Sequence, residues 1–191
     1  MPSPSREHGH LPRLARPAYR GLAAVHWVFT VQDRRTGWLD ESFFVRFQLV
    51  ATHAFHRYRL VGPCLCLMPD HIHLLVLGVD EERSDQLAAM SFLRRQLRPH
   101  LAPCDWQRPA YDHVLRDHER QPDAFVKTAS YIRANPFRAG LVPDEASPWP
   151  FACAVVPGYP DLDPAADDFW ERFWRIYDRL VNPRPPIREE I

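Results

Sequence analysis

The stretch Leu-Met-Pro-Asp-His-Ile-His-Leu-Leu-Val-Leu, residues 67–77, sets the topology that we expect for the whole chain. Side chains two apart in a β-strand project from the same face, so His71 and His73 lie side by side while Ile72 points into the core. The Pro69-Asp70 turn starts this strand, and the apolar run at 74–77 continues it. Two imidazole rings are thereby directed at one point in otherwise apolar surroundings.

A histidine pair of this kind has three interpretations. Buried or edge histidines with ordinary hydrogen-bond partners are the commonest outcome for an isolated His-x-His motif, because two ligands alone do not define a metal site. The apolar flanks make two polar rings costly, which favours half of a divalent metal site. A zinc site completed by Cys64 and Cys66 is less favoured, because zinc ligands usually come from turns.

The hydrophobic pattern predicts the order strand, helix, strand, strand, helix, strand. The expected elements are a strand at 23–31, a helix after Asp40, a strand at 57–67, the histidine strand, a helix at 84–98, a strand at 111–116 and an extra helix at 122–134. This order matches the ferredoxin-like βαββαβ arrangement, an α+β fold with an antiparallel sheet. Helices on one face would leave the other open, and the extra helix is expected to cover it.

Length and composition suit one domain with attachments. We expect a flexible N-terminal arm at 1–21, a main domain at 22–142, and a proline-rich acidic extension at 143–191. The extension contains an expected helix at 167–181 whose aromatic stripe would serve core packing or a subunit contact. The sequence has no apolar run long enough for a membrane span and no signal-peptide pattern, so we expect a cytoplasmic protein with no membrane partner.

The net charge is zero, with 24 basic and 24 acidic residues, which does not favour nucleic-acid binding. The distribution is uneven: residues 1–142 hold 19 basic and 14 acidic residues, and the rest hold 5 and 10. One hypothesis is that the acidic extension screens a basic face, and its deletion would then tighten DNA binding at low salt.

The extra helix carries a second candidate group of residues. Tyr131 and Asn135 are four apart and share a surface away from the stripe of Phe125 and Ile132. A tyrosine hydroxyl can attack phosphorus once a metal polarises the phosphate, and an amide oxygen could be a third metal ligand. The alternatives are a half-buried helical tyrosine and an asparagine that caps the helix before Pro136.

Three blocks carry a resemblance to a known family: MPDHIHLL at 68–75, YDHVLRD at 111–117 and YIRANPFRAGLV at 131–142. They resemble the blocks of the single-tyrosine HUH transposases, in particular the REP-associated tyrosine transposases of bacteria, over about residues 23–149. Three blocks in the right order are far more specific than any one. The resemblance implies a metal-dependent endonuclease and strand transferase that acts on single-stranded, hairpin-bearing DNA through a 5′-phosphotyrosine and a free 3′-OH. It also implies that His71, His73 and Asn135 bind Mg²⁺ or Mn²⁺ and that Tyr131 is the nucleophile.

We therefore favour an enzyme that nicks and rejoins DNA over two alternatives, a domesticated protein that binds DNA hairpins without cleaving them and a small structural metalloprotein. The expected partner is single-stranded or hairpin DNA, and the expected state is a monomer or a homodimer in which Tyr131 could come from the second subunit. Arginines on a helix often form only a solvated face, but five are candidate phosphate contacts. They are Arg94, Arg95, Arg98, Arg133 and Arg138.

Overall fold

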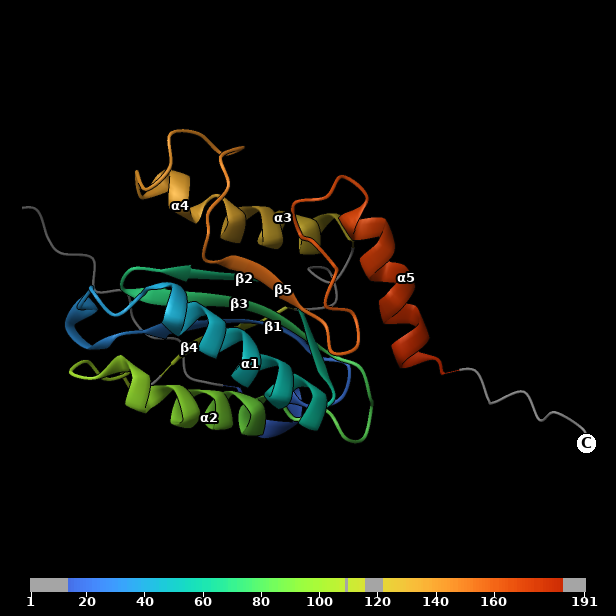
Figure 1. The fold of residues 1–191 in the computed structure, drawn as a ribbon. Coiled ribbons are helices and arrows are strands. Elements are labelled where there is room, and N and C mark those ends of the chain that lie inside the picture. The colour runs from blue at the N-terminus through green and yellow to red at the C-terminus, as the bar shows by residue number, and fades with distance from the viewer. Residues whose placement is uncertain (1–13, 109, 116–121, 184–191) are drawn as a thin grey trace, which may run out of the picture.

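A five-stranded sheet with the strand order β4-β1-β3-β2-β5 forms the centre of the computed structural model (Figure 1), which describes residues 14–108, 110–115 and 122–183. Every neighbouring pair of strands is antiparallel. The strands are β1 (Ala24–Thr30), β2 (Leu60–Met68), β3 (His71–Gly78), β4 (Tyr111–Val114) and β5 (Ala152–Val155).

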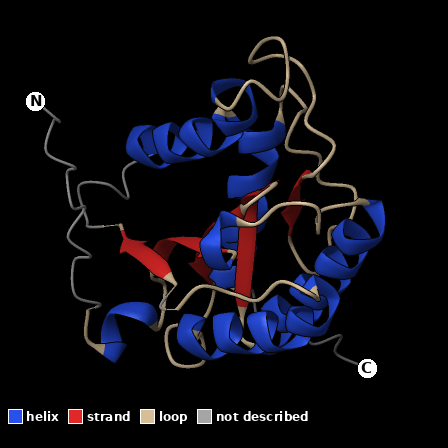
Figure 2. Ribbon diagram, turned by 90° about the vertical axis from the view of Figure 1, so that its left-hand side faces the viewer, coloured by secondary structure: helices blue, strands red, loops and turns tan. Residues whose placement is uncertain are grey.

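Helices cover both faces of this sheet. Figures 1 and 2 show α1 and α2 along one face, and α3 with α5 on the other. The helices are α1 (Glu41–Arg57), α2 (Gln86–Leu97), α3 (Pro122–Arg133), the one-turn α4 (Asn135–Arg138) and α5 (Phe169–Val181), with 3-10 turns at Arg16–Tyr19, Gln32–Arg34 and Arg98–Leu101. No helix of the described residues is long and apolar enough to cross a membrane.

The alternation of side chains along the strands produces two separate hydrophobic cores. On β1, Trp27 and Phe29 point into the core beneath α1 and α2. The opposite face of the sheet carries Leu75 and packs against Phe125 of α3 and Phe173 of α5. The residues of β3 therefore alternate between the two cores, and the histidines lie on the face that α3 covers.

The predicted order of elements and the α+β class are confirmed. The helix expected after Asp40 begins at Glu41, and the Asp40 carboxylate accepts a hydrogen bond from the backbone N–H of Phe43 at 2.7 Å, as an N-cap does. The extra helix covers the second face of the sheet, as expected. The last residue of the predicted fourth strand, residue 116, lies outside the described residues.

The sheet continues beyond residue 142, where we had expected an extension. Strand β5 pairs with β2, with Cys153 opposite Leu65, and so belongs to the same sheet. Its four residues are too few for a hydrophobic period to be recognised in the sequence. Helix α5 lies within the predicted range of 167–181 and buries Phe169 and Phe173 in the second core, so its aromatic stripe serves core packing.

The expected N-terminal arm is wrong for its last residues. A 3-10 turn at Arg16–Tyr19 buries Tyr19 completely, and the Tyr19 hydroxyl donates a hydrogen bond to the Asp112 carboxylate of β4. A proline-rich composition does not prevent a single aromatic side chain from anchoring such a segment in the core. The remainder of the expected arm, residues 1–13, lies outside the described residues.

Candidate active site

The predicted histidine pair lies at the start of β3, on the face of the sheet that α3 covers. Cross-strand register places His71 opposite Thr30 and His73 opposite Val28 of β1. His73 is buried, with 5% of its surface exposed. The two rings approach each other with a distance of 3.0 Å between the His71 Nε2 and His73 Nε2 atoms. The strand geometry expected from the sequence is therefore present.

The other nitrogen of each ring has a partner of its own. His71 Nδ1 lies 2.6 Å from Asp70 Oδ1, and the Asp70 carboxylate also pairs with Arg34 at 2.8 Å. His73 Nδ1 lies 3.0 Å from Nε2 of His26 on β1. If both Nδ1 atoms donate to these partners, both Nε2 atoms keep a lone pair. Partners of this kind commonly fix the tautomer and orientation of metal-binding histidines.

The spacing of the two Nε2 atoms fits a divalent cation. Ligands about 2.1 Å from an ion in neighbouring positions of an octahedron lie about 3.0 Å apart. The separation of 3.0 Å in the structure agrees with this value. In the described ranges, no three His, Cys, Asp or Glu side chains converge as a metal site, so among these residues a third ligand would be of another type. Asn135 supplies an amide of that type.

Burial keeps the central histidines neutral. Burial, together with the charges of His113 and His71, lowers the pKa of His26 to about 4. Burial also lowers the pKa of His73 to about 3, with further contributions from His26 and His71, while a side-chain hydrogen bond with Asn135 acts in the opposite direction. Neutral imidazole is the form that binds metals, so the electrostatics of the site are compatible with a cation near pH 7.

Tyr131 lies beside the histidines and remains accessible. Its ring centroid is 6.2 Å from that of His73 and 6.4 Å from that of His26, with edge-to-face geometry in both pairs. The side chain is 45% exposed, so it is not a core tyrosine. The Arg138 guanidinium lies 5.1 Å from the centre of the Tyr131 ring. The helix surface predicted from the spacing therefore brings the phenol to the histidine pair.

Asn135 forms the helix cap considered for it and also lies beside His73. Its Nδ2 group donates to the carbonyl oxygens of Tyr131 at 2.8 Å and Ile132 at 3.3 Å, which ends α3 as a side-chain cap. The same side chain forms a hydrogen bond with His73. Because the amide nitrogen is used by the cap, the cap itself can orient the oxygen of Asn135.

The zinc alternative with Cys64 and Cys66 finds no support in the contacts of these thiols. Cys64 donates to the carbonyl oxygen of Ala129 at 3.6 Å, and Cys66 contacts the sulfur of Met68 at 3.8 Å. Burial raises the pKa of both thiols, that of Cys66 to about 12. Thiolate is the form that binds zinc, so these two cysteines are structural residues of the second core.

The five predicted arginines do not form one surface. Arg133 and Arg138 are exposed on the α3–α4 side, close to Tyr131. The other three belong to α2 and its C-terminal end, in the layer that covers the opposite face of the sheet (Figure 1). They are Arg94, Arg95 and Arg98. Neighbours on one helix could be recognised in the sequence, whereas the placement of α2 relative to α3 depends on the fold.

Sequence reasoning missed the contributions of His26 and Asp70. His26 was visible only as a polar residue inside an apolar strand, and Asp70 only as a turn residue. Their contacts with the histidine pair depend on strand register and turn geometry. A polar side chain in an apolar strand is the signal that could have identified His26.

The sheet order, the covering helix and the histidine pair with a nearby tyrosine define a ferredoxin-like α+β protein with a candidate active site on the face that α3 covers. No family model matches the sequence. The chain is 24% identical over 143 residues to a protein of Haemophilus influenzae named "Putative REP-associated tyrosine transposase", an alignment that covers 66% of this chain and 77% of that protein. The resemblance recognised from the three sequence blocks is thereby confirmed.

One solved structure agrees with this assignment of the fold. A REP-associated tyrosine transposase bound to a REP hairpin superposes with a TM-score of 0.61 at 17% identity, over 74% of this chain and 82% of that chain. A bacterial tRNA(His) guanylyltransferase-like protein in complex with GTP reaches a TM-score of only 0.38 at 10% identity, over 72% of this chain and 74% of that chain. The fold of this chain is that of the REP-associated tyrosine transposase.

Proposed function

We propose that this protein is a metal-dependent strand transferase that cuts and rejoins single-stranded, hairpin-bearing DNA through Tyr131. The observation that carries the proposal is the position of the accessible Tyr131 phenol beside the histidine pair, with its ring 6.2 Å from His73. The similarity to a transposase described as bound to a REP hairpin supports DNA hairpins as the substrate class.

His71, His73 and Asn135 would hold Mg²⁺ or Mn²⁺, which supplies Lewis-acid polarisation of the scissile phosphate. Asp70 contacts the Nδ1 atom of His71, and His26 contacts the Nδ1 atom of His73, so these two residues orient the two imidazoles. The cap made by Asn135 fixes the end of α3, which also carries Tyr131. All the side chains of this site come from one chain, so a monomer is sufficient for the proposed chemistry.

The reaction is a transesterification at phosphorus. The Tyr131 hydroxyl oxygen forms a bond to phosphorus and loses its proton, while the bond from phosphorus to the 3′ oxygen breaks and that oxygen takes up a proton. The products are a 5′-phosphotyrosine and a free 3′-OH. One phosphoester replaces another, so the reverse reaction can rejoin DNA without ATP.

Arginines near the tyrosine can contact the phosphates. Arg138 lies 5.1 Å from the Tyr131 ring centre, and Arg133 is exposed on the same side of the sheet. The guanidinium group forms bidentate hydrogen bonds with phosphate oxygens, which positions DNA without reading its sequence. DNA would reach Arg94, Arg95 and Arg98 only where it extends beyond the face of the sheet that α3 covers.

The test is the formation of a covalent adduct. The wild-type chain, incubated with a 5′-labelled or 3′-labelled single-stranded hairpin oligonucleotide and Mg²⁺ or Mn²⁺, is expected to give a protein–DNA adduct that survives denaturing electrophoresis. The label should remain on the protein only when it lies 3′ of the cut, because the phosphotyrosine holds the 5′ end. Tyr131→Phe should give no adduct and should bind the same oligonucleotide with similar affinity. Tyr111→Phe is the matched control, because Tyr111 is equally exposed at 45% and lies on edge strand β4.

A second outcome would favour a different function. Hairpin binding without an adduct in Mg²⁺, Mn²⁺, Zn²⁺ or Ni²⁺ would support the hairpin-binding protein that does not cleave. An adduct that persists in Tyr131→Phe and disappears in Tyr111→Phe would show that Tyr111 of the edge strand is the nucleophile, which would contradict the proposal.

A further inference from the structure

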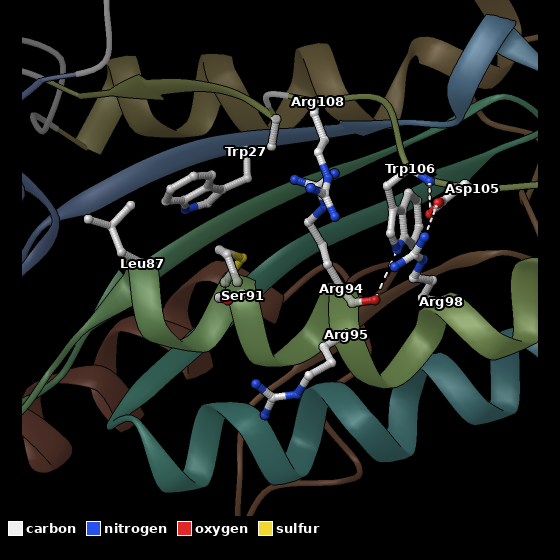
Figure 3. A pocket seen from close by; sticks show the side chains of 11 residues that line it. Trp27, Leu87, Ser91, Arg94, Arg95, Arg98, Asp105, Trp106 and Arg108 are labelled. Carbon is white, nitrogen blue, oxygen red and sulfur yellow. Dashed lines mark hydrogen bonds and ion pairs between the residues drawn. The ribbon is translucent and has the colours of Figure 1, made fainter.

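A cavity of about 480 Å³ lies between α2 and the segment that leads from the end of α2 to β4, on the face of the sheet opposite the histidine pair. Figure 3 shows this cavity with α2 below it and Arg108 above it. Its volume falls within the range of small-ligand sites, which is roughly 300–1,000 Å³. A mononucleotide can enter a cavity of this size, whereas a DNA duplex cannot.

Positive charge dominates the lining of this cavity. Four arginines and one acidic residue, Asp105, line it. Asp105 pairs with Arg98 at 2.5 Å. In Figure 3, Arg94 extends up from α2 and Arg108 extends down from the opposite wall, so both reach into the same space, whereas Arg95 points away towards α1. Like charges that share a cavity repel each other, and an anion between them relieves the repulsion.

The arginine at the centre of the cavity is held in place before any ligand binds. Arg94 donates to the carbonyl oxygen of Gln107 at 2.7 Å, and its guanidinium lies 5.5 Å from the Phe29 ring centre and 5.9 Å from that of Trp106. Trp106 in turn donates its indole N–H to the Arg94 carbonyl oxygen at 3.0 Å. A side chain fixed in this way loses little conformational freedom on binding, which increases affinity.

The same cavity has an apolar wall. Leu87 and Met90 of α2 line it with Trp27 of β1, and Figure 3 shows Leu87 and Trp27 at the end away from Arg98. A wall of this kind beside clustered guanidinium groups fits a ligand with an anionic end and a flat, mostly apolar end. A nucleotide has both, in its phosphate and its base.

We infer that this cavity binds one unpaired nucleotide of the DNA strand that flanks the hairpin, with its phosphate between Arg94 and Arg108 and its base against the wall formed by Leu87. The inference rests on the proposed function for the identity of the ligand. The position of the cavity supports it. Trp27 lies next to His26 on β1 and faces the opposite side of the sheet, so the cavity and the histidine site are separated by the sheet near edge strand β4.

Edge strand β4 gives a single strand a short route between the two sites. Within the described residues, β4 pairs only with β1, so it is an edge of the sheet, and its first residue, Tyr111, is 45% exposed. One strand, β1, lies between β4 and β3, and the two inter-strand spacings correspond to a lateral distance of about 10 Å. An unpaired strand can bend over this edge and stack a base on Tyr111, whereas a stiff duplex cannot.

Fluorescence anisotropy with two hairpin oligonucleotides tests the inference. One hairpin carries an unpaired flank and the other is blunt. We expect the wild-type chain to bind the flanked hairpin about tenfold more tightly, which is the effect of one charge-assisted phosphate contact. Arg108→Glu should remove this difference and leave the affinity for the blunt hairpin nearly unchanged.

Two further variants separate the cavity from general charge effects. Ser91→Trp places a bulky side chain at the cavity lining without changing the charge, and it should also remove the preference for the flanked hairpin. Arg179→Glu is the matched charge control on α5, on the other face of the sheet, and should keep the preference. Thermal unfolding checks that each variant is folded. In the wild-type chain, a titrated deoxynucleoside 5′-monophosphate should shift the NMR signal of the Trp106 indole N–H.

The possible results divide clearly. Equal affinity of the wild type for both hairpins, or equal weakening by Arg108→Glu and Arg179→Glu, would overturn the inference. A loss of blunt-hairpin binding in Arg108→Glu would also overturn it, because the cavity would then contact duplex phosphates. If the wild type forms the Tyr131 adduct while Arg108→Glu keeps the preference, the cavity assignment fails and the cutting function stands. If no adduct forms but Arg108→Glu loses the preference, the cavity assignment stands and the cutting function fails.

Discussion

The Nε2 atom of His26 lies 3.0 Å from the Nδ1 atom of His73. In the proposed site, the metal would bind the other ring nitrogen of His73, Nε2. At the scale of single residues this contact determines which tautomer His73 adopts. When His73 Nδ1 donates to His26, the lone pair of His73 Nε2 is directed towards His71 Nε2. When the donation runs from His26 to His73 instead, the proton lies on His73 Nε2 and blocks a ligand position.

His26→Ala is expected to weaken Mn²⁺ binding by roughly ten- to a hundredfold, because partners of this kind tune metal affinity by that factor. His26→Gln should recover part of the loss, since an amide oxygen can accept the same hydrogen bond. Calorimetric titration of the apoprotein with Mn²⁺ measures both variants. ¹⁵N chemical shifts of the His73 ring report its tautomer without metal. Wild-type affinity in His26→Ala would contradict the role of His26.

The two buried histidines also predict a pH dependence of stability. The pKa values of His26 and His73 are lowered to about 4 and about 3 in the folded chain, from an ordinary value near 6.5. Above pH 6.5 both states are neutral, and the shifts have no effect. As the pH falls below 6.5, the unfolded chain binds protons that the folded chain does not, so the free energy of unfolding decreases.

Between pH 7 and pH 5, we expect these two histidines to reduce the free energy of unfolding by on the order of 2–4 kcal/mol. Urea unfolding at several pH values measures this slope. His26→Gln removes one of the two groups and should give a shallower decrease over the same range. A slope that does not change in this variant would show that other groups cause the pH dependence.

Single-residue predictions from the sequence succeeded where they depended on local spacing. The period of two placed His71 and His73 on one face, and the spacing of four placed Tyr131 and Asn135 on one surface. The contact of His26 with His73 could not be predicted, because it depends on the register of β1 against β3. The register depends on how two strands align, and His26 and His73 are 47 positions apart in the sequence. The hydrophobic pattern of one strand alone does not determine this alignment.

Helix α5 shows at the scale of elements what a sequence pattern can and cannot determine. Its aromatic stripe predicted a helix with one apolar face, and the structure confirms it. The stripe did not reveal which surface this face would bury. The partner is the second core, beside α3 and the sheet, and strand β5, which leads into α5, is too short to be recognised by its pattern.

Phe173→Ala should therefore reduce the free energy of unfolding by about 3–5 kcal/mol, the usual effect of removing a buried phenylalanine. Phe173 is fully buried between α5 and the sheet. Arg175→Ala, two residues on and exposed, is the matched control and should change stability by less than about 0.5 kcal/mol. Chemical unfolding monitored by circular dichroism measures both. A small effect of Phe173→Ala would show that α5 is only loosely attached.

The whole molecule depends on its C-terminal quarter. Deletion of residues 143–191 removes β5 from the edge of β2 and exposes the apolar surface of the second core. We expect the shortened chain to lose cooperative thermal unfolding, measured by calorimetry, and to aggregate. Cooperative unfolding of residues 1–142 with an unchanged midpoint would contradict this.

The proposed screening of a basic face by the acidic tail consequently needs a different experiment. Charge changes at exposed positions of the tail, such as Asp161→Asn together with Asp163→Asn, leave β5 and α5 in place. Tighter DNA binding by this variant at low salt would support screening. Affinity equal to that of the wild type would contradict it.

The overall topology could be predicted because the order of strands and helices along the chain restricts a small α+β domain to few arrangements. The placement of α2 and α3 on opposite faces followed from the same order. What could not be predicted is that Arg94 points into the cavity while Arg95 of the same helix points towards α1, because this depends on how α2 is rotated about its axis.

Strand β2 has a consequence for how this protein is made. All nine of its residues are buried in the finished fold, and β5, which covers its outer edge, is 84 residues further along the chain when counted from Met68 to Ala152. A ribosome adds this segment at roughly 5–20 residues per second, so the apolar edge stays uncovered for about 4–17 seconds. During that interval, β2 offers unpaired backbone groups to any other extended chain, and a holding chaperone would protect it.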